Sequence, residues 1–192
     1  MKRMYIIAGP NGAGKTVASH ASLSKVFNCN EFVNADEIAK ALSPFNPESV
    51  AIKSGRLMLG RIRELLESNE SFAFETTLST KSYVSLIRES HEKGYIITLY
   101  FLYLNSLEIA MDRVHTRVQE GGHNIPPEII KRRYNAGLIN FFNLYKDIVD
   151  SWVLLDNSKP KSVLIASKSK QFDTFIAQNE LWHHLKKTYH GR

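Results

Sequence analysis

The residues with the clearest chemical potential are GPNGAGKT at positions 9–16, which match the phosphate-binding pattern GxxxxGK[ST]. They follow an apolar run at 4–8 and precede a segment of helical period, which is the context that this pattern requires. Glycines let the backbone wrap a phosphate, the lysine reaches the β- and γ-phosphates, and the threonine hydroxyl binds Mg²⁺. We therefore predict an ATP site with a catalytic Lys15 and a Mg²⁺ ligand in Thr16. Its residues are Gly9, Pro10, Asn11, Gly12, Ala13, Gly14, Lys15 and Thr16.

Carboxylates and hydroxyls occur where two predicted strands end. Asp36 closes the run at 31–36, and we expect it to accept a proton from an acceptor hydroxyl or to hold Mg²⁺ through water. The alternative for Asp36 is the N-cap of a helix that begins near Glu37. Glu75 and Thr77 end the run at 72–77 and are expected to contact a polar substrate in the same crevice. Alternatively, Glu75 could lie near Mg²⁺, and Thr77 could cap a helix.

Arginines on two helical segments are the third group, and the Gly/Pro-rich sequence GGHNIPP separates these segments. Phosphoryl transfer spreads negative charge over the γ-phosphate oxygens, which arginines on a closing lid would neutralise. The alternative is that these arginines form surface ion pairs with nearby acidic residues. We predict catalytic roles for Arg117 and Arg133, and substrate contacts for Arg113, His123 and Arg132.

The elements that must position these residues alternate along the chain. Nearly continuous apolar runs predict buried strands at 4–8, 31–36, 72–77, 95–104 and 151–156. Segments of helical period lie at 14–27, 47–68, 81–93, 106–120 and 127–149. We also expect a last strand at 163–166 and a helix at 177–189, and we assign the aromatic residues Phe141, Phe142 and Tyr145 to the core.

This alternation predicts the α/β class, specifically a P-loop NTPase three-layer sandwich around a mostly parallel central sheet. The expected architecture is a doubly wound sheet with an Arg-bearing helical lid at about 106–135. Residues 1–192 form a single domain in this prediction, and 159–192 are a basic tail of unassigned role.

Composition and charge narrow the function. The chain has 25 Lys and Arg against 19 Asp and Glu, but residues 1–158 hold 18 basic and 17 acidic side chains, so the surplus lies in the tail. Total charge therefore does not favour a nucleic-acid partner. A single cysteine and an apolar run of only about ten residues favour a cytoplasmic protein without a membrane span.

Other P-loop classes have further motifs that this sequence lacks. An Asn-Lys-x-Asp motif of switch GTPases and an LSGGQ-like signature of ABC-type ATPases are both absent. A small kinase remains, in which ATP and Mg²⁺ serve transfer to a small-molecule hydroxyl. Two alternatives stay open: an ATPase associated with nucleic acid, and a nucleotide-binding regulatory module without transfer.

Four segments in one order resemble the zeta-toxin-like P-loop kinases, in particular the short branch labelled predicted ABC-type ATPase. They are GPNGAGKT, NADEIAKALSP, FETTLS and RVHTRVQEGGHNIPPEIIKRRY, within residues 4–158. The resemblance implies a P-loop kinase fold like that of the nucleotide kinases. It also implies ATP-dependent phosphorylation of the 3′-hydroxyl of the amino sugar in UDP-N-acetylglucosamine.

By position, Lys15 and Thr16 would handle ATP and Mg²⁺, and Asp36 resembles the catalytic base of that family. Glu75 and Thr77 would contact the nucleotide sugar, and the lid arginines resemble its phosphate-stabilising pair. The resemblance also implies a small antitoxin protein as partner.

Overall fold

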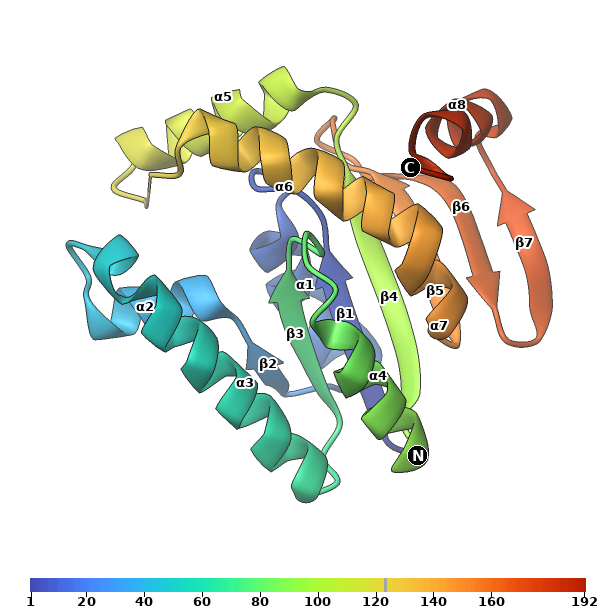
Figure 1. Ribbon diagram of the computed structural model, residues 1–192, viewed down its shortest axis with the longest axis horizontal. Coiled ribbons are helices and arrows are strands. Elements are labelled where there is room, and N and C mark those ends of the chain that lie inside the picture. Colours follow the sequence, from blue (N-terminus) through green and yellow to red (C-terminus); the bar gives the residue numbers. More distant parts are fainter. Residues whose placement is uncertain (123) are drawn as a thin grey trace.

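The computed structural model describes residues 1–122 and 124–192 and has one seven-stranded sheet at its centre (Figure 1). The strands lie in the order β2-β3-β1-β4-β5-β6-β7. The first five pair in parallel, whereas β6 and β7 pair antiparallel. The predicted α/β class with a mostly parallel sheet is confirmed. The strands are β1 Arg3–Ala8, β2 Glu31–Val33, β3 Phe72–Thr76, β4 Ile96–Tyr103, β5 Ser151–Asp156, β6 Val163–Ser169 and β7 Phe172–Ile176.

The central strand β1 explains why the apolar runs are continuous. It lies between β3 and β4, where Ile6 is opposite Phe74 on one side and Leu99 on the other, and all three are completely buried. Strands covered on both faces need apolar residues at every position. Because the chain passes from β3 to β4 across β1, a crevice opens at the carboxyl ends of these strands. The phosphate-binding residues follow β1 at that point.

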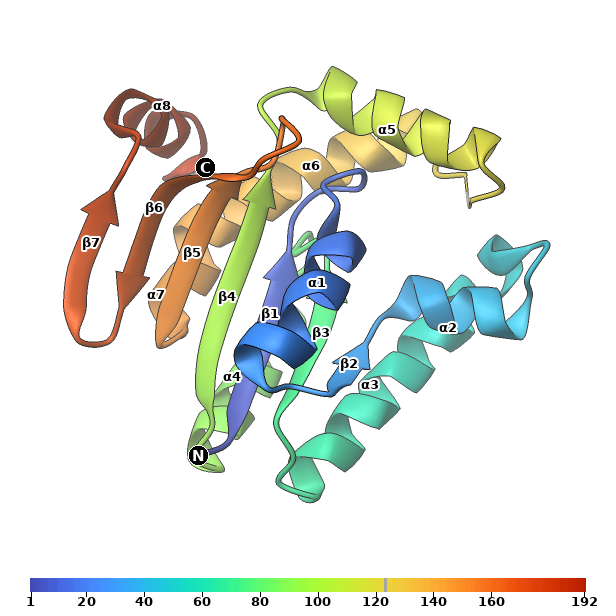
Figure 2. The same cartoon turned by 180° about the vertical axis from the view of Figure 1, so that it is seen from behind.

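Helices cover both faces of the sheet. Figure 1 shows α4, α6 and α8 on one face, and Figure 2 shows α1 on the other, while α2 and α3 lie beside β2. The segment expected as one helix at 127–149 is divided into an α-helix, a π-helical turn and a short α-helix. The helical elements are α1 Lys15–Phe27, α2 Ala35–Leu42, η1 Pro47–Val50, α3 Ala51–Glu67, α4 Tyr83–Glu92, α5 Leu107–Gln119, α6 Pro127–Asn140, η2 Phe141–Tyr145, α7 Lys146–Ile148 and α8 Asn179–Tyr189.

The two helices of the expected lid have buried faces. In α5 the side chains of Ala110 and Val114 are buried, and in α6 those of Ile130, Tyr134 and Leu138 are buried. The aromatic residues of the π-helical turn lie in the same core, as predicted, and the Phe141 ring is tilted against that of Phe101, with centroids 5.1 Å apart. Both arginine-bearing helices therefore have a buried face, and α5 packs against α6.

The C-terminal residues belong to the folded domain. Strand β7 pairs with β6 and was not predicted, whereas helix α8 lies within the segment 177–189 that was predicted to be helical. Trp182 of α8 stacks on Trp152 of β5, with ring centroids 5.5 Å apart and planes within 10°. Residues 159–192 thus contribute Ile165, Ala166, Trp182 and Leu185 to the hydrophobic core and do not form an extended basic arm. Within the described part of the chain, no helix is long and apolar enough to cross a membrane.

Candidate active site

The phosphate-binding loop joins β1 to α1 at the centre of the sheet edge. Gly9 has φ 140°, and a Cβ there would lie 2.4 Å from the carbonyl oxygen of Leu102, so only glycine lets the loop pass β4 this closely. Gly14 precedes α1 with φ 77°, which turns the chain into the helix. The loop therefore presents the N-terminal end of α1 to the crevice, an arrangement that binds phosphate through backbone N–H groups.

Lys15 is buried beneath this loop. Its Nζ donates to the carbonyl oxygen of Pro10 at 2.9 Å and lies 3.5 Å from Glu75 Oε1. Burial lowers the pKa of Lys15 below its ordinary value, and the negative charges of Glu75 and Asp36 partly oppose that change. An anion bound in the loop would stabilise the ammonium further, so the site favours a polyphosphate ligand.

Two side chains whose oxygen atoms could bind a metal ion lie side by side next to Lys15. The Thr16 hydroxyl donates to Glu75 Oε2 at 2.7 Å, so the first turn of α1 contacts the end of β3. The Asn34 amide also donates to Glu75 Oε2, at 2.9 Å. A hydroxyl and a carboxylate at this distance form the donor set that Mg²⁺ prefers. Thr16 and Glu75 thus fit a magnesium ion carried by ATP.

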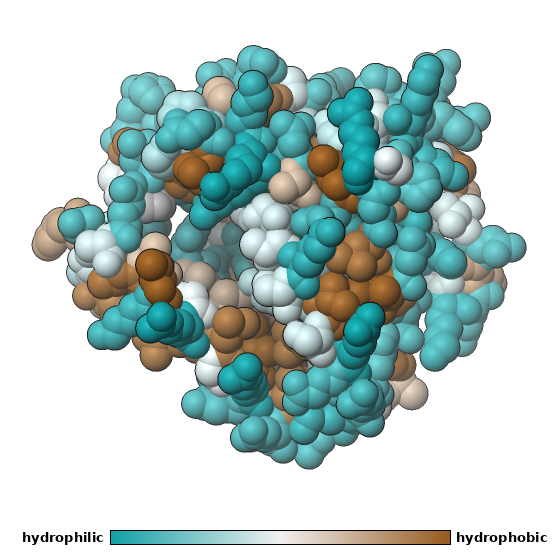
Figure 3. Space-filling model, viewed as in Figure 1, coloured by the Kyte–Doolittle hydropathy of each residue, from teal (hydrophilic) through white to brown (hydrophobic). Residues whose placement is uncertain are grey.

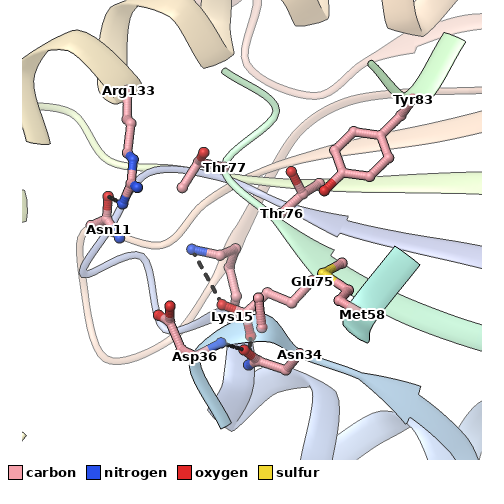
Figure 4. Close-up of a pocket in the computed structure, with 11 residues that line it drawn as sticks. Asn11, Lys15, Asn34, Asp36, Met58, Glu75, Thr76, Thr77, Tyr83 and Arg133 are labelled. Atoms are coloured by element: carbon pink, nitrogen blue, oxygen red, sulfur yellow. Dashed lines mark hydrogen bonds and ion pairs between the residues drawn. The ribbon is translucent and has the colours of Figure 1, made fainter. Parts of the chain in front are cut away.

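Asp36 occupies a different local setting from the expected one. Strand β2 ends at Val33, and Asp36 lies in the first turn of α2. The N-cap is Asn34, whose side chain accepts from the backbone N–H groups of Asp36 and Glu37, so the capping alternative for Asp36 is wrong. Freed from capping, the exposed Asp36 carboxylate points toward the space that Lys15 also faces (Figure 4).

A pocket of about 190 Å³ lies in front of these groups. Its polar wall contains Thr76 and Thr77 at the end of β3, and Figure 4 shows Thr77 between the Arg133 side and the Tyr83 side of the pocket. Met58 of α3 and Tyr83 of α4 supply a less polar wall. The combination of hydroxyls with apolar surface suits a small polyhydroxylated molecule.

The arginines predicted for the lid divide into different settings. Arg133 of α6 lines the pocket, and its Nη1 donates to Asn11 Oδ1 at 3.4 Å. Burial lowers its pKa, while the charge of Asp36 acts in the opposite direction. Arg117 of α5 is half-buried, and its positive charge is one of those that lower the pKa of Lys15. Arg132 is exposed and does not line the pocket, and His123 lies outside the described residues.

Arg113 contacts backbone rather than the pocket. Its guanidinium donates to the carbonyl oxygens of Asn157 at 2.9 Å, Ser158 at 2.8 Å and Gly12 at 3.4 Å. Asn157 in turn donates to the carbonyl oxygen of Ala13 at 2.6 Å. This geometry gives Arg113 a different task from the predicted substrate contact, because it fastens the phosphate-binding loop to the segment after β5. The ion pairs considered as an alternative for it do not occur among the described residues.

Helix α6 and the π-helical turn η2 that follows it also hold the loop that carries Thr77. Asn140 donates to the carbonyl oxygen of Leu78 at 2.8 Å, and Tyr145 donates to that of Thr80 at 2.7 Å. At Gly137, a Cβ would lie 2.5 Å from the carbonyl oxygen of Thr77. The middle of α6 therefore bears Arg133, while the end of α6 and the π-helical turn after it hold the loop of the pocket wall. Figure 3 shows the surface hollowed between the α2 side and the α6 side of this crevice.

We expect Gly137→Ala to displace α6 from the Thr77 loop. Overpacking against backbone costs about 1–3 kcal/mol, so the free energy of unfolding should fall by that amount. The KM for the phosphate acceptor should rise more than the KM for ATP, since the new methyl group meets Thr77. Denaturant unfolding and steady-state kinetics measure both effects.

Gly55→Ala in α3 is the matched control. A Cβ at Gly55 meets nothing within 4 Å, and alanine is favoured over glycine in a helix by about 0.5–1 kcal/mol. This variant should be slightly stabilised with unchanged kinetics. Equal behaviour of the two variants would contradict the close contact between α6 and the Thr77 loop.

The arrangement can perform phosphoryl transfer. It combines a phosphate-binding loop, a buried ammonium, a hydroxyl–carboxylate pair and a free carboxylate that faces a polar pocket. Sequence reasoning missed the pocket residues Asn34, Met58 and Tyr83. Of these, Asn34 carried a signal, since asparagine directly before a helical segment is a favoured N-cap.

Comparison with known proteins identifies a family and a shared fold. A family model described as Zeta toxin matches residues 1–169. An uncharacterized protein of Haemophilus influenzae is 31% identical over 126 residues, which cover 66% of this chain and 88% of that protein.

Two solved structures resemble the whole chain at low sequence identity. A chain of the AvrRxo1-ORF1:AvrRxo1-ORF2 complex is 18% identical to this chain, with a TM-score of 0.74. The match covers 96% of this chain and 63% of the other. The PezAT chromosomal toxin–antitoxin system of Streptococcus pneumoniae contains a chain that is 13% identical with a TM-score of 0.65. That match covers 100% of this chain and 80% of the other. At these identities the likeness is one of fold.

Proposed function

This chain belongs to the zeta toxin family of P-loop phosphotransferases, and we propose that it transfers the γ-phosphate of ATP to a hydroxyl of a nucleotide sugar. UDP-N-acetylglucosamine is the first candidate acceptor, because the sequence motifs resemble zeta-toxin-like kinases. The observation that carries the proposal is the pocket shared by Lys15, Asp36 and Arg133. In one space it holds a phosphate-binding cation, a free carboxylate and a second cation.

The transfer assigns one task to each of these groups. Asp36 takes the proton of the acceptor hydroxyl as its oxygen forms a bond to the γ-phosphorus. The bond between that phosphorus and the β–γ bridging oxygen breaks, and ADP leaves with the electron pair. Lys15 and Arg133 face the phosphoryl oxygens, where they offset the negative charge of the transition state. Arg117 is the further candidate for this task.

Thr16 and Glu75 would hold Mg²⁺. When bound, the ion neutralises charge on the β- and γ-phosphates. The hydrogen bond of 2.7 Å between the two side chains keeps both oxygens at the edge of the phosphate-binding loop. Glu75 is the one carboxylate of the pocket that already contacts the loop, which leaves Asp36 for proton transfer.

The acceptor is expected to contact the hydroxyl-rich wall. Thr76 and Thr77 offer hydroxyls for the sugar, and Tyr83 and Met58 offer apolar surface for its ring. A protein antitoxin is proposed as the partner, because the PezAT structure is described as a toxin–antitoxin system. The alternative of a nucleic-acid-associated ATPase rests on a basic tail at 159–192. These residues instead fold as β6, β7 and α8 at the edge of the sheet.

The experiment is incubation with γ-labelled ATP and Mg²⁺, together with a panel of UDP-sugars, free sugars and nucleosides. Label transferred to UDP-N-acetylglucosamine alone would support the full proposal, and label on another acceptor would keep the kinase and change its substrate. Label released only as phosphate, with every acceptor and with DNA or RNA present, would overturn the transfer function. The chain with Asp36→Asn serves as the negative control.

A further inference from the structure

Asn34 connects the two halves of the candidate active site. Its side chain is 5% exposed and lies between the start of α2 and the end of β3. Its Oδ1 accepts from the backbone N–H of Asp36 at 2.8 Å and of Glu37 at 3.4 Å. Its Nδ2 donates to Glu75 Oε2 at 2.9 Å and to Thr16 Oγ1 at 3.4 Å. One amide thus touches both the helix of Asp36 and the Thr16–Glu75 pair.

The orientation of this amide follows from its partners. Backbone N–H groups can only donate, so the oxygen of the Asn34 amide must face α2. The nitrogen then faces Glu75, which as a carboxylate can only accept. Aspartate could serve the helix but would repel Glu75, and serine could serve the helix but is too short to reach Glu75. Asparagine is suited to both contacts at once.

We propose that Asn34 is a positioning residue that orients Glu75 for Mg²⁺ and fixes the helix turn that carries Asp36. This inference rests on the proposed function of the site. The donated hydrogen bond holds the Glu75 carboxylate against Thr16, so the two oxygens are already in place when the ion arrives with ATP. The accepted hydrogen bonds hold the first turn of α2, which fixes the backbone position from which the Asp36 side chain extends.

Ser and Ala at position 34 separate the two contacts. Asn34→Ser keeps an N-cap acceptor and loses the contact with Glu75, whereas Asn34→Ala loses both. Loss of a group that orients a metal ligand commonly lowers metal affinity or activity by about 10–100-fold. Both variants should therefore show a Mg²⁺ contribution to ATP affinity reduced by about 10–100-fold. Only Asn34→Ala should show a further fall in kcat and a lower melting temperature.

The measurement is ATP binding by titration calorimetry with Mg²⁺ and with EDTA, and the ratio of the two affinities gives the Mg²⁺ contribution. ATP affinity in EDTA should be unchanged in Asn34→Ser. A double-mutant cycle with Glu75→Gln tests whether Asn34 acts through Glu75. Once Glu75 is altered, Asn34→Ser should reduce the Mg²⁺ contribution to ATP affinity little further. An unchanged Mg²⁺ contribution in Asn34→Ser, or full additivity with Glu75→Gln, would overturn the inference.

These readouts also separate this inference from the proposed function. Binding and melting temperature require no phosphoryl transfer, so they test Asn34 even if no acceptor is phosphorylated. Conversely, label transfer with an Asn34→Ser variant that keeps the wild-type Mg²⁺ contribution would retain the kinase and remove Asn34 from its machinery.

Discussion

Asp36→Asn should lower kcat by about 10²–10⁴-fold while ATP affinity near neutral pH stays close to that of the wild type. The amide has nearly the same shape as the carboxylate and cannot accept the proton of the acceptor hydroxyl. Asp36 is exposed and forms no N-cap, so its replacement leaves the start of α2 with its Asn34 cap intact. Single-turnover kinetics and ATP titration measure the two quantities.

The neighbouring Glu37 provides the matched control. It lies in the same helix turn and is exposed, and its carboxylate contacts His20 at 3.5 Å instead of lining the pocket. Glu37→Gln removes the same charge from the same turn and should leave kcat within a few-fold of wild type. Near-normal turnover in Asp36→Asn would remove Asp36 from the proton transfer. Equal losses in both variants would indicate a general charge effect.

A pH effect accompanies the loss of Asp36. Its negative charge raises the pKa of Lys15 against the larger lowering by burial. Without that charge the pKa of Lys15 falls further, so the ammonium deprotonates at lower pH. The alkaline decline of ATP affinity should therefore begin at a lower pH in Asp36→Asn than in the wild type. An unchanged alkaline profile would contradict an electrostatic link between the two residues.

Lys15→Ala should reduce phosphoryl transfer by at least about 10²–10³-fold and weaken ATP binding as well. The ammonium is buried beside the loop, so no water-exposed cation can replace it there. The variant keeps the loop glycines and the Thr16–Glu75 contact, so ADP-like ligands retain their backbone contacts. ATP titration and turnover in the same preparation show whether both quantities fall.

The wild-type protein has a pH dependence that Lys15→Ala should lack. Lys15 must be protonated to attract the phosphates, and burial holds its pKa below the ordinary 10.5. ATP affinity should fall as the pH rises through this lowered pKa, and bound ATP should raise it again by favouring the charged form. Lys53→Ala, which removes an exposed lysine of α3, is the control and should keep the wild-type profile. Unchanged ATP affinity and rate in Lys15→Ala would contradict the assignment of the loop.

Sequence patterns predicted the elements that depend on local chemistry and full burial. Each of the five parallel strands was expected within a few residues of its observed place, because a strand covered on both faces leaves a continuous apolar run. The edge strand β7 was missed for the opposite reason. Its residues are mostly exposed and include Asp173 and Thr174, so neither periodicity nor apolar content distinguishes it from a loop.

The start of α2 shows the limit of reading strand ends from sequence. The strand was predicted to extend to residue 36, yet it stops at Val33 because the Asn34 side chain accepts hydrogen bonds from the first N–H groups of a new helix. A cap of this kind depends on one side chain. Its second contact, to Glu75, joins residues 41 positions apart and cannot be inferred from local spacing.

The sequence by itself predicted a phosphate-binding loop, because the eight residues at 9–16 are contiguous and such a loop forms its site largely through its own backbone. The tertiary structure alone decided what Arg113 and Arg133 contact. Arg113 and Arg133 both lie on helices after β4, but one reaches backbone carbonyls after β5 and the other reaches Asn11 in the pocket. The direction of a long side chain is set by which helix face is buried against which strand, and that is a property of the packed sheet.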